Sequence, residues 1–173
     1  MKIKEFAILA LFIALTAVAT IIIRIPIPQT NGYMNLGDTM VLLSGTFFGP
    51  LFAFVAGGVG SALADLIGGY PQWAPWTLII KGIEAILVVG LVALMRLKKK
   101  QPSILFVLCY ILAVAWMVTG YFIAEWIMYD QKAALAELPM NILQAGGSVI
   151  LASLLLPLFN RIIGNVGTQS DSN

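Results

Sequence analysis

Long apolar stretches without a charged residue dominate this sequence and constrain its fold more than any other feature. Charged residues make up 10% of the chain and hydrophobic residues 60%. Soluble domains carry about a quarter charged residues, so this chain has too few charges to cover a water-exposed surface. The composition predicts an integral membrane protein, and it excludes a disordered chain or a nucleic-acid-binding protein as the main interpretation.

The apolar stretches divide the chain into six expected helices. A membrane-spanning helix needs roughly 20 residues, so 173 residues accommodate about six spans and no separate soluble domain. We expect one membrane domain over residues 1–163 and a disordered polar tail over residues 164–173. Prolines and an Asn-Gly pair predict a loop from Arg24 to Asn35, and residues 130–137 are expected to be a polar connector. The expected helices cover approximately residues 5–23, 36–48, 51–69, 76–95, 103–128 and 138–163. Pro139 is expected in the first turn of the last helix, where a missing N–H costs little.

The positions of Lys and Arg residues predict how the helices are oriented. Gly49-Pro50 interrupts the second apolar stretch, which is either one kinked helix or two helices joined by a tight hairpin. Basic residues favour the cytoplasmic side, which places Lys2, Lys4 and the cluster from Arg96 to Lys100 inside. An even number of spans must separate these two sites, so we choose the hairpin, six helices and two cytoplasmic termini. The second helix reaches only about 20 Å, so it must be tilted, buried or surrounded by thin bilayer.

Several kinds of chemistry lack the residues they need. The sequence has no histidine, which excludes Ser-His or Cys-His nucleophilic chemistry, His-ligated metals and haem. It also has no phosphate-binding loop, so another chain would have to hydrolyse ATP for uphill transport. The single cysteine, Cys109, lies in an apolar run and is expected to be a buried thiol. We therefore expect no catalytic residue, metal site or cofactor on this chain.

Few ionisable residues lie at membrane depth, and such residues are candidates for function. Lys81 and Glu84 are spaced i, i+3 on one expected helix and can form a pair. Asp65 is expected at the outer end of the preceding helix, so Asp65 and Lys81 are candidates for an ion network that joins the two helices. Asp38 is expected to be the N-cap of its helix.

Glu125 has no basic residue within one turn of its own helix, so it needs a different explanation. Asn141 and Gln144, spaced i, i+3, are expected at the same depth, with Tyr121 nearby. Amides donate to and accept from the edge of a nitrogen heterocycle, and aromatic rings stack on its face. This set therefore suits a small polar aromatic ligand. Trp73 is assigned instead to the interfacial aromatic belt.

Small residues repeat every fourth position on two expected helices. Such rows let helix backbones approach closely in a membrane. In the first helix, Ala10 and Ala14 form a row that either packs internally or docks a partner. In the third helix, the row of Ala56, Gly60 and Ala64 predicts internal packing.

An ordered set of motifs resembles the S components of energy-coupling factor (ECF) vitamin transporters. The resemblance covers about residues 5–163, and the branch that it resembles most contains carriers of hydroxymethylpyrimidine or pyridoxine, related to riboflavin-type S components. In chain order the motifs are Asn35-Leu-Gly-Asp38, Gly49-Pro50, Gly57-Gly-Val-Gly-Ser-Ala-Leu-Ala-Asp65-Leu-Ile-Gly-Gly-Tyr-Pro71, Ala74-Pro75 and Ile80-Lys-Gly-Ile-Glu84.

The resemblance implies a six-helix bundle in the bacterial plasma membrane, with an outward vitamin site closed by the loop between the first two helices. It implies that Ala10 and Ala14 dock a transmembrane T component, which sits on two cytoplasmic ATPases. The S component would topple in the membrane to carry its ligand inward. The ligand-binding residues implied by family position are Glu84, Tyr121, Glu125, Asn141, Gln144, Asn31 and Tyr33.

The sequence thus favours a non-enzymatic subunit that captures a small vitamin or vitamin precursor, of the hydroxymethylpyrimidine or pyridoxine type, for ATP-driven uptake. Riboflavin, thiamine and pantothenate are alternative ligands for the same kind of subunit. A membrane-embedded enzyme using Glu125 is a further alternative, although no clear nucleophile accompanies it. A purely structural assembly subunit would leave the amides of Asn141 and Gln144 unexplained.

Overall fold

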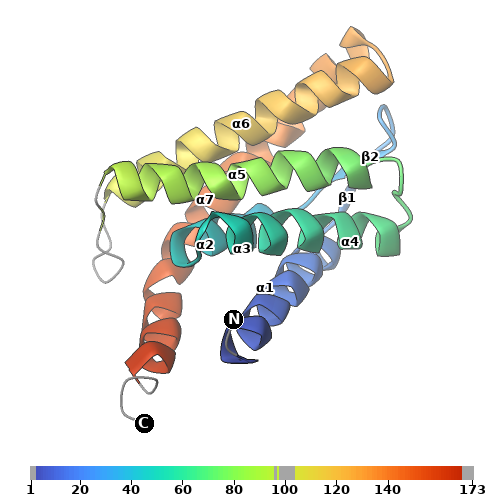
Figure 1. Ribbon diagram of the computed structural model, residues 1–173. Helices are drawn as coiled ribbons and strands as arrows, with labels where there is room; N and C mark the ends of the chain where they lie inside the picture. The colour runs from blue at the N-terminus through green and yellow to red at the C-terminus, as the bar shows by residue number, and fades with distance from the viewer. Residues whose placement is uncertain (1–2, 96, 98–103, 169–173) are drawn as a thin grey trace.

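The computed structural model describes residues 3–95, 97 and 104–168, and within this part the chain is mostly helical (Figure 1). The expected basic cluster (Arg96, Lys98, Lys99 and Lys100), Lys2 and the tail residues 169–173 lie outside the described residues. The elements are α1 (Ile3–Ile22), β1 (Ile25–Ile27), β2 (Gly32–Met34), α2 (Asp38–Phe47), α3 (Pro50–Phe54), the π-helical segment η1 (Val55–Val59), α4 (Gly60–Gly68), α5 (Ala74–Leu94), α6 (Ile104–Met128) and α7 (Gln131–Thr168).

Within the described residues, five helical stretches are long and apolar enough to cross a membrane. α2 is not one of them, because its 10 residues span only about 15 Å. All of its residues except Phe47 are buried, so α2 is a core helix enclosed by its neighbours. Of the alternatives expected for this short helix, tilted, buried or surrounded by thin bilayer, the structure shows burial. The candidate spans are Glu5–Ile22, Pro50–Gly68, Ala74–Leu94, Ile104–Met128 and Gln131–Ile163.

The break between α2 and α3 falls where Gly49-Pro50 predicted it. Phe48 and Gly49 both have extended backbone angles, and a new helix begins at Pro50. Proline is well tolerated there because the first turn of a helix has no partner for its missing N–H. From Pro50 the chain stays helical through η1 to Gly68, and it ends at Gly69, whose φ of 87° is left-handed and therefore suits glycine.

The small residues of η1 and α4 pack inside the protein, which confirms the expectation for this row. Ala56, Gly60 and Ala64 are all buried. A Cβ atom on Gly60 would lie 2.8 Å from the carbonyl oxygen of Ile13 on α1. Close approach of α1 to this segment therefore requires glycine at that position.

The outer face of α1 is not covered by any other described element of the chain. Ala10 and Ala14 are exposed on this face, together with Phe6 and Leu11, which are 57% and 54% exposed. The buried face carries Thr16, whose hydroxyl donates to a carbonyl of its own helix. α1 thus presents an apolar, small-residue surface to its surroundings.

Helix α7 differs from its expected boundaries at both ends. It begins at Gln131, so most of the expected polar connector is helical, and it continues to Thr168, into the expected tail. The Asp130 carboxylate accepts a 2.8 Å hydrogen bond from the backbone N–H of Ala133, an N-cap that starts the helix before Pro139. Pro139 is therefore inside the helix, where it removes one backbone hydrogen bond, and it does not open the helix as expected.

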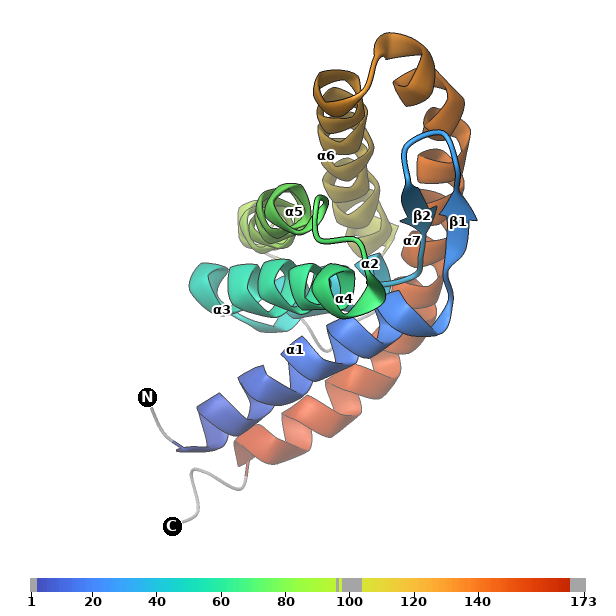
Figure 2. The same cartoon turned by 90° about the vertical axis from the view of Figure 1, so that its right-hand side faces the viewer.

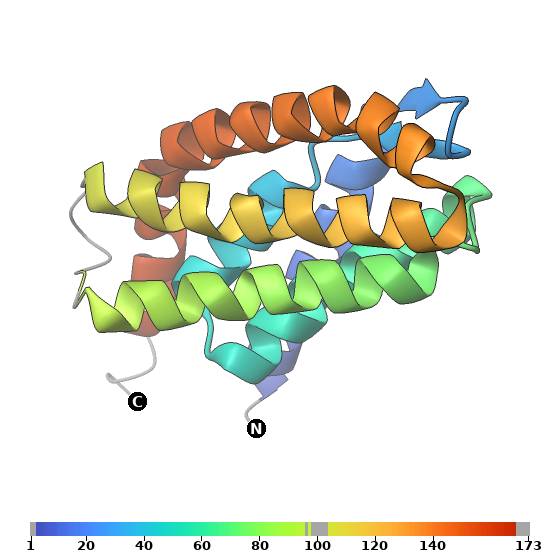
Figure 3. The ribbon, with the colours of Figure 1, turned by 90° about the horizontal axis from the view of Figure 1, so that it is seen from above.

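Three irregular segments gather at one end of the bundle (Figures 2 and 3). They are the β1–β2 hairpin, the turn between α4 and α5, and the turn between α6 and α7. The hairpin is a detail that the all-α fold class did not include. It lies in the segment expected as a loop, and its strands pair antiparallel with Pro26 opposite Tyr33. Asn31 in its turn has a φ of 46°, which asparagine tolerates better than most residues.

Candidate functional site

A cavity lies beneath the hairpin, enclosed by side chains from the hairpin, α4, α5, α6 and α7. The space between its walls is about 330 Å³, of which about 20 Å³ is wide enough for the centre of a water molecule. The walls are therefore close together, with room for little more than one water. Its lining residues are Gly32, Tyr33, Asn35, Asp65, Trp73, Thr77, Tyr121, Glu137, Asn141 and Gln144.

The hairpin is anchored over the cavity by hydrogen bonds to three different parts of the chain. Tyr33 donates a 2.5 Å bond to Asp65 Oδ1 on α4. Thr30 donates to Glu137 Oε2 on α7. The Asn31 carbonyl accepts from the Trp73 indole, with an Nε1 to O distance of 3.1 Å. These contacts close the hairpin over the site.

The Tyr33 hydroxyl is held in its protonated form by its surroundings. Burial and the neighbouring Asp65 carboxylate raise the pKa of Tyr33 above its usual value, because both disfavour a phenolate. The hydroxyl is therefore available as a donor to Asp65 at neutral pH.

Aromatic side chains form one wall of the cavity. Trp73 is only 4% exposed, and its ring centroid lies 5.9 Å from that of Tyr121. The Tyr121 hydroxyl is 2.9 Å from Thr77 Oγ1. Trp73 is therefore a wall of the cavity, and its assignment to an exposed interfacial belt is wrong. Its indole N–H finds a partner in the hairpin, as buried tryptophans usually require.

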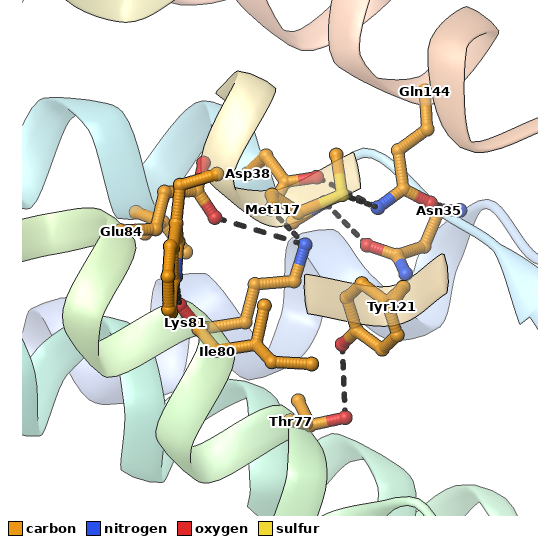
Figure 4. A network of polar contacts seen from close by, with 12 residues as sticks. Asn35, Asp38, Thr77, Ile80, Lys81, Glu84, Met117, Tyr121 and Gln144 are labelled. Atoms are coloured by element: carbon orange, nitrogen blue, oxygen red, sulfur yellow. Dashed lines mark hydrogen bonds and ion pairs between the residues drawn. The ribbon is translucent and has the colours of Figure 1, made fainter. Parts of the chain in front are cut away.

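The floor of the cavity is a network centred on Gln144 (Figure 4). Gln144 Oε1 accepts from the Asn35 backbone N–H at 2.8 Å, and Gln144 Nε2 donates to Asp38 Oδ2 at 2.7 Å. The Gln144 amide is thus already engaged by the protein. Asp38 is the first residue of α2 and the N-cap position is Gly37, so the expectation that Asp38 caps this helix is wrong.

Below the cavity, Lys81 sits between two carboxylates. It forms an ion pair with Asp38, and its Nζ lies 3.9 Å from Glu84 Oε2. The expected Lys81–Glu84 pair is therefore present. Asp65, a candidate for the same ion network, does not pair directly with Lys81: buried α2 brings Asp38 to Lys81, and Asp65 accepts a hydrogen bond from Tyr33. All three members of the Lys81 cluster are buried.

Four of the seven residues expected to bind ligand line the cavity together: Tyr33, Tyr121, Asn141 and Gln144. The other three lie elsewhere. Glu84 is in the Lys81 cluster. Glu125 accepts a 2.8 Å hydrogen bond from Asn141 Nδ2 but does not itself line the cavity. Asn31 has an exposed side chain and contributes its backbone carbonyl to the hairpin contacts.

Sequence reasoning assigned Asp65 to an ion network and Trp73 to the interfacial belt, and it missed four more cavity residues altogether: Gly32, Asn35, Thr77 and Glu137. Helical spacing contained a signal for Glu137, because Glu137, Asn141 and Gln144 are i, i+4 and i+7 and therefore share one face of α7. Interpreting Pro139 as the start of the helix hid this pattern. Thr77 has the same spacing relationship to Lys81 and Glu84 on α5. The positions of Gly32 and Asn35 depend on the hairpin, which no local pattern predicted.

Comparison with known proteins identifies the class. The family described as "ECF-type riboflavin transporter, S component" matches residues 1–161, and this chain belongs to that family of multi-pass membrane proteins. An uncharacterized protein from Pyrococcus woesei is 40% identical over 86% of this chain and 97% of its own length. The thiamine precursor transporter HmpT from Lactococcus lactis subsp. cremoris is 33% identical, over 92% of this chain and 90% of its own length.

A solved structure supports the fold. Its description is "Structure and mechanism of the S component of a bacterial ECF transporter", and it superposes with a TM-score of 0.62, covering 94% of this chain and 96% of its own. The two sequences are 18% identical, so this similarity supports only a shared fold.

Proposed function

We propose that this protein captures a small vitamin precursor of the hydroxymethylpyrimidine or pyridoxine type outside the cell, as the substrate-binding subunit of an ECF transporter. The observation that carries the proposal is the cavity under the hairpin, which combines aromatic walls with the polar groups of Asn141, Asp65 and Glu137. The relative HmpT, described as a thiamine precursor transporter, supports a ligand of this kind.

The chemistry of the cavity suits a small heterocycle. The rings of Trp73 and Tyr121 offer faces for stacking, and the Asn141 amide offers an edge for hydrogen bonding. The volume open to the centre of a water molecule is only about 20 Å³, so the walls must move apart before a ring can enter. A large ligand such as a flavin would require more movement than a single substituted ring.

Ligand entry requires the hairpin to move. The cavity is too narrow for a heterocycle in this conformation, and Thr30, Asn31 and Tyr33 each anchor the hairpin. Hydrogen bonds of this kind contribute about 0.5–1.5 kcal/mol each, so opening is accessible. The hairpin would act as a lid that closes after the ligand enters.

The topology that fits this function has six helices and two cytoplasmic termini within one membrane domain. If buried α2 is counted as the sixth helix, all three irregular segments fall on the same side of the membrane. This agrees with their grouping at one end of the bundle (Figure 3). With that end outside, the cavity faces the source of the ligand. The opposite end of the bundle, where α5 ends and α6 begins, then faces the cytoplasm, as the positive charges of the sequence between these two helices favour.

We further propose that the uncovered face of α1 docks the transmembrane T component. Ala10 and Ala14 are both exposed there and permit close approach of a partner helix. Two ATPase subunits bound to the T component would hydrolyse ATP, and toppling of this subunit would present the cavity to the cytoplasm. This chain would act without a cofactor of its own.

Ligand binding by the purified protein tests the first part of the proposal. We expect saturable quenching of tryptophan fluorescence by hydroxymethylpyrimidine or pyridoxine, because Trp73 lines the cavity. Mass spectrometry of small molecules that co-purify with the protein would identify the ligand independently. Absence of saturable binding to every B vitamin and precursor tried would refute the proposal.

Bulky substitutions on α1 test partner docking. Ala10→Trp with Ala14→Trp should leave ligand binding intact but abolish uptake by cells that contain the partner subunits. Ala115→Trp is the matched control, because Ala115 is exposed on α6, away from α1. If the double variant still assembles and transports like the wild type, α1 is not the docking surface.

A further inference from the structure

Glu137 touches both the hairpin and the cavity. Its Oε2 accepts a hydrogen bond from Thr30 in the hairpin turn. Its Oε1 has no hydrogen-bond partner among the described residues. This oxygen lies at the cavity wall beside Gly32, and a Cβ atom added to Gly32 would be 3.2 Å from it. One carboxylate thus has one oxygen on the lid and the other facing the site.

The hydrogen-bonding capacity of the cavity is biased toward acceptors. Asp65 and Glu137 both line it, and within the described part of the chain no Lys or Arg does. Lys81 lies below and pairs with Asp38. Arg24 stacks on the Tyr33 ring and donates to the Gly68 carbonyl. A neutral acceptor group on the ligand would find no donor on these two carboxylates, and an anionic group would in addition face like charge.

The two carboxylates are not equally available. Asp65 Oδ1 is taken by Tyr33, and its Oδ2 is enclosed without a partner. The Gln144 amide is engaged at both ends by Asn35 and Asp38. Glu137 Oε1 is therefore the acceptor that is both unpaired and positioned at the cavity wall.

We propose that Glu137 determines ligand specificity by accepting a hydrogen bond from an amino group of the ligand. Thr30 bonds the same carboxylate, so a ligand bound at Oε1 stabilises the closed hairpin. This inference rests on the proposed function and adds to it the chemical class of the ligand, an amino-substituted nitrogen heterocycle. A site built to bond a donor discriminates strongly against an analogue that lacks it, because its own polar group is then left unpaired.

The experiment compares two probes on the purified full-length protein. One is hydroxymethylpyrimidine, which carries an amino group, and the other is its analogue with a keto oxygen in place of that amino group. We expect the wild type to bind the amino probe at least tenfold more tightly. Glu137→Gln should reduce this preference at least tenfold, because the glutamine amide can turn an N–H toward the keto oxygen.

Two further variants separate recognition from folding. Thr30→Val removes the hairpin contact but keeps the carboxylate, so it should weaken both probes by a similar factor and preserve the preference. Asp130→Asn changes an exposed acid that caps the same helix, and it should bind both probes like the wild type. A general structural effect of Glu137→Gln would weaken both probes equally.

Different outcomes overturn different statements. Equal binding of the two probes by the wild type, a measurement that needs no variant, overturns the role of Glu137 while leaving the proposed function intact. An unchanged preference in folded Glu137→Gln does the same. Failure of the wild type to bind either probe or any other vitamin overturns the proposed function, and the inference with it.

Discussion

Two buried polar clusters both include residues of α5 but differ in how their hydrogen-bonding capacity is used. The inner cluster, Asp38, Lys81 and Glu84, is an ion network whose cation lies between its carboxylates. Both Glu84 oxygens are buried without a hydrogen-bond partner, but Glu84 does not line the cavity. The outer cluster, which lines the cavity, includes Glu137 with an acceptor that no described protein group uses. Burial is similar in the two clusters, so burial alone does not mark the ligand site. The ligand site is marked instead by a hydrogen-bonding group that lies at a cavity wall and has no partner in the described part of the protein.

The largest effect is expected at the centre of the inner cluster. Lys81→Met leaves the carboxylates of Asp38 and Glu84 buried without their counter-charge, which should lower the free energy of unfolding by about 3–5 kcal/mol. Thermal unfolding of the purified protein in detergent measures this change. Lys132→Met is the control, because Lys132 is exposed. If Lys81→Met is as stable as the control, the inner cluster does not support the fold.

Gln144 sits at the boundary between the clusters and should act as part of the inner one. Gln144→Leu leaves Asp38 Oδ2 and the Asn35 N–H without this partner, at an expected loss of about 1–3 kcal/mol of stability. Gln131→Leu, at an exposed position of the same helix, should change stability much less. A variant with native stability that has lost ligand binding would instead assign Gln144 to the ligand site.

Trp73 tests the hairpin closure of the outer cluster. Trp73→Phe keeps an aromatic ring but removes the N–H that bonds the Asn31 carbonyl. We expect the free energy of ligand binding to weaken by about 1 kcal/mol, which is a roughly fivefold loss of affinity. Titration calorimetry with hydroxymethylpyrimidine measures it. Trp126→Phe, on an exposed part of α6, should bind like the wild type. Equal affinity in both variants would show that this contact does not contribute to closure.

The smallest effect is expected where the polar stripe of α7 continues past both clusters. Ser148 Oγ is buried without a hydrogen-bond partner, so Ser148→Ala should be neutral or stabilising by up to about 1 kcal/mol. Ser153 Oγ donates to the Val149 carbonyl at 2.7 Å, and Ser153→Ala should not stabilise. Thermal unfolding compares them. A clear loss of stability in Ser148→Ala would indicate that its hydroxyl has a role in the fold.

Local patterns predicted most helices but misplaced one boundary that matters for the site. The break at Gly49-Pro50 and the helices over residues 76–95 and 103–128 lie within two residues of their expected ends. Pro139 was interpreted as a helix start because proline is favoured there. The Asp130 cap begins the helix earlier, and Glu137 thereby joins the face that carries Asn141.

Site residues were predictable where helical spacing groups them and unpredictable where they depend on contacts between distant segments. The spacing of Asn141 and Gln144 placed both on one face of a helix, and both line the cavity. Tyr33 was indicated only through the family resemblance. The partnership of Lys81 with Asp38 joins residues far apart in the chain, and no local period encodes it.

The sequence by itself determined that this is a helical membrane protein, because a chain with 10% charged residues cannot cover itself with a water-compatible surface. Its ordered motifs also indicated the S-component family. Only the tertiary structure decided which polar groups are saturated and which remain available. That distinction depends on how α2, α7 and the hairpin pack together, because a hydrogen-bond partner is set by proximity in space and not by distance along the chain.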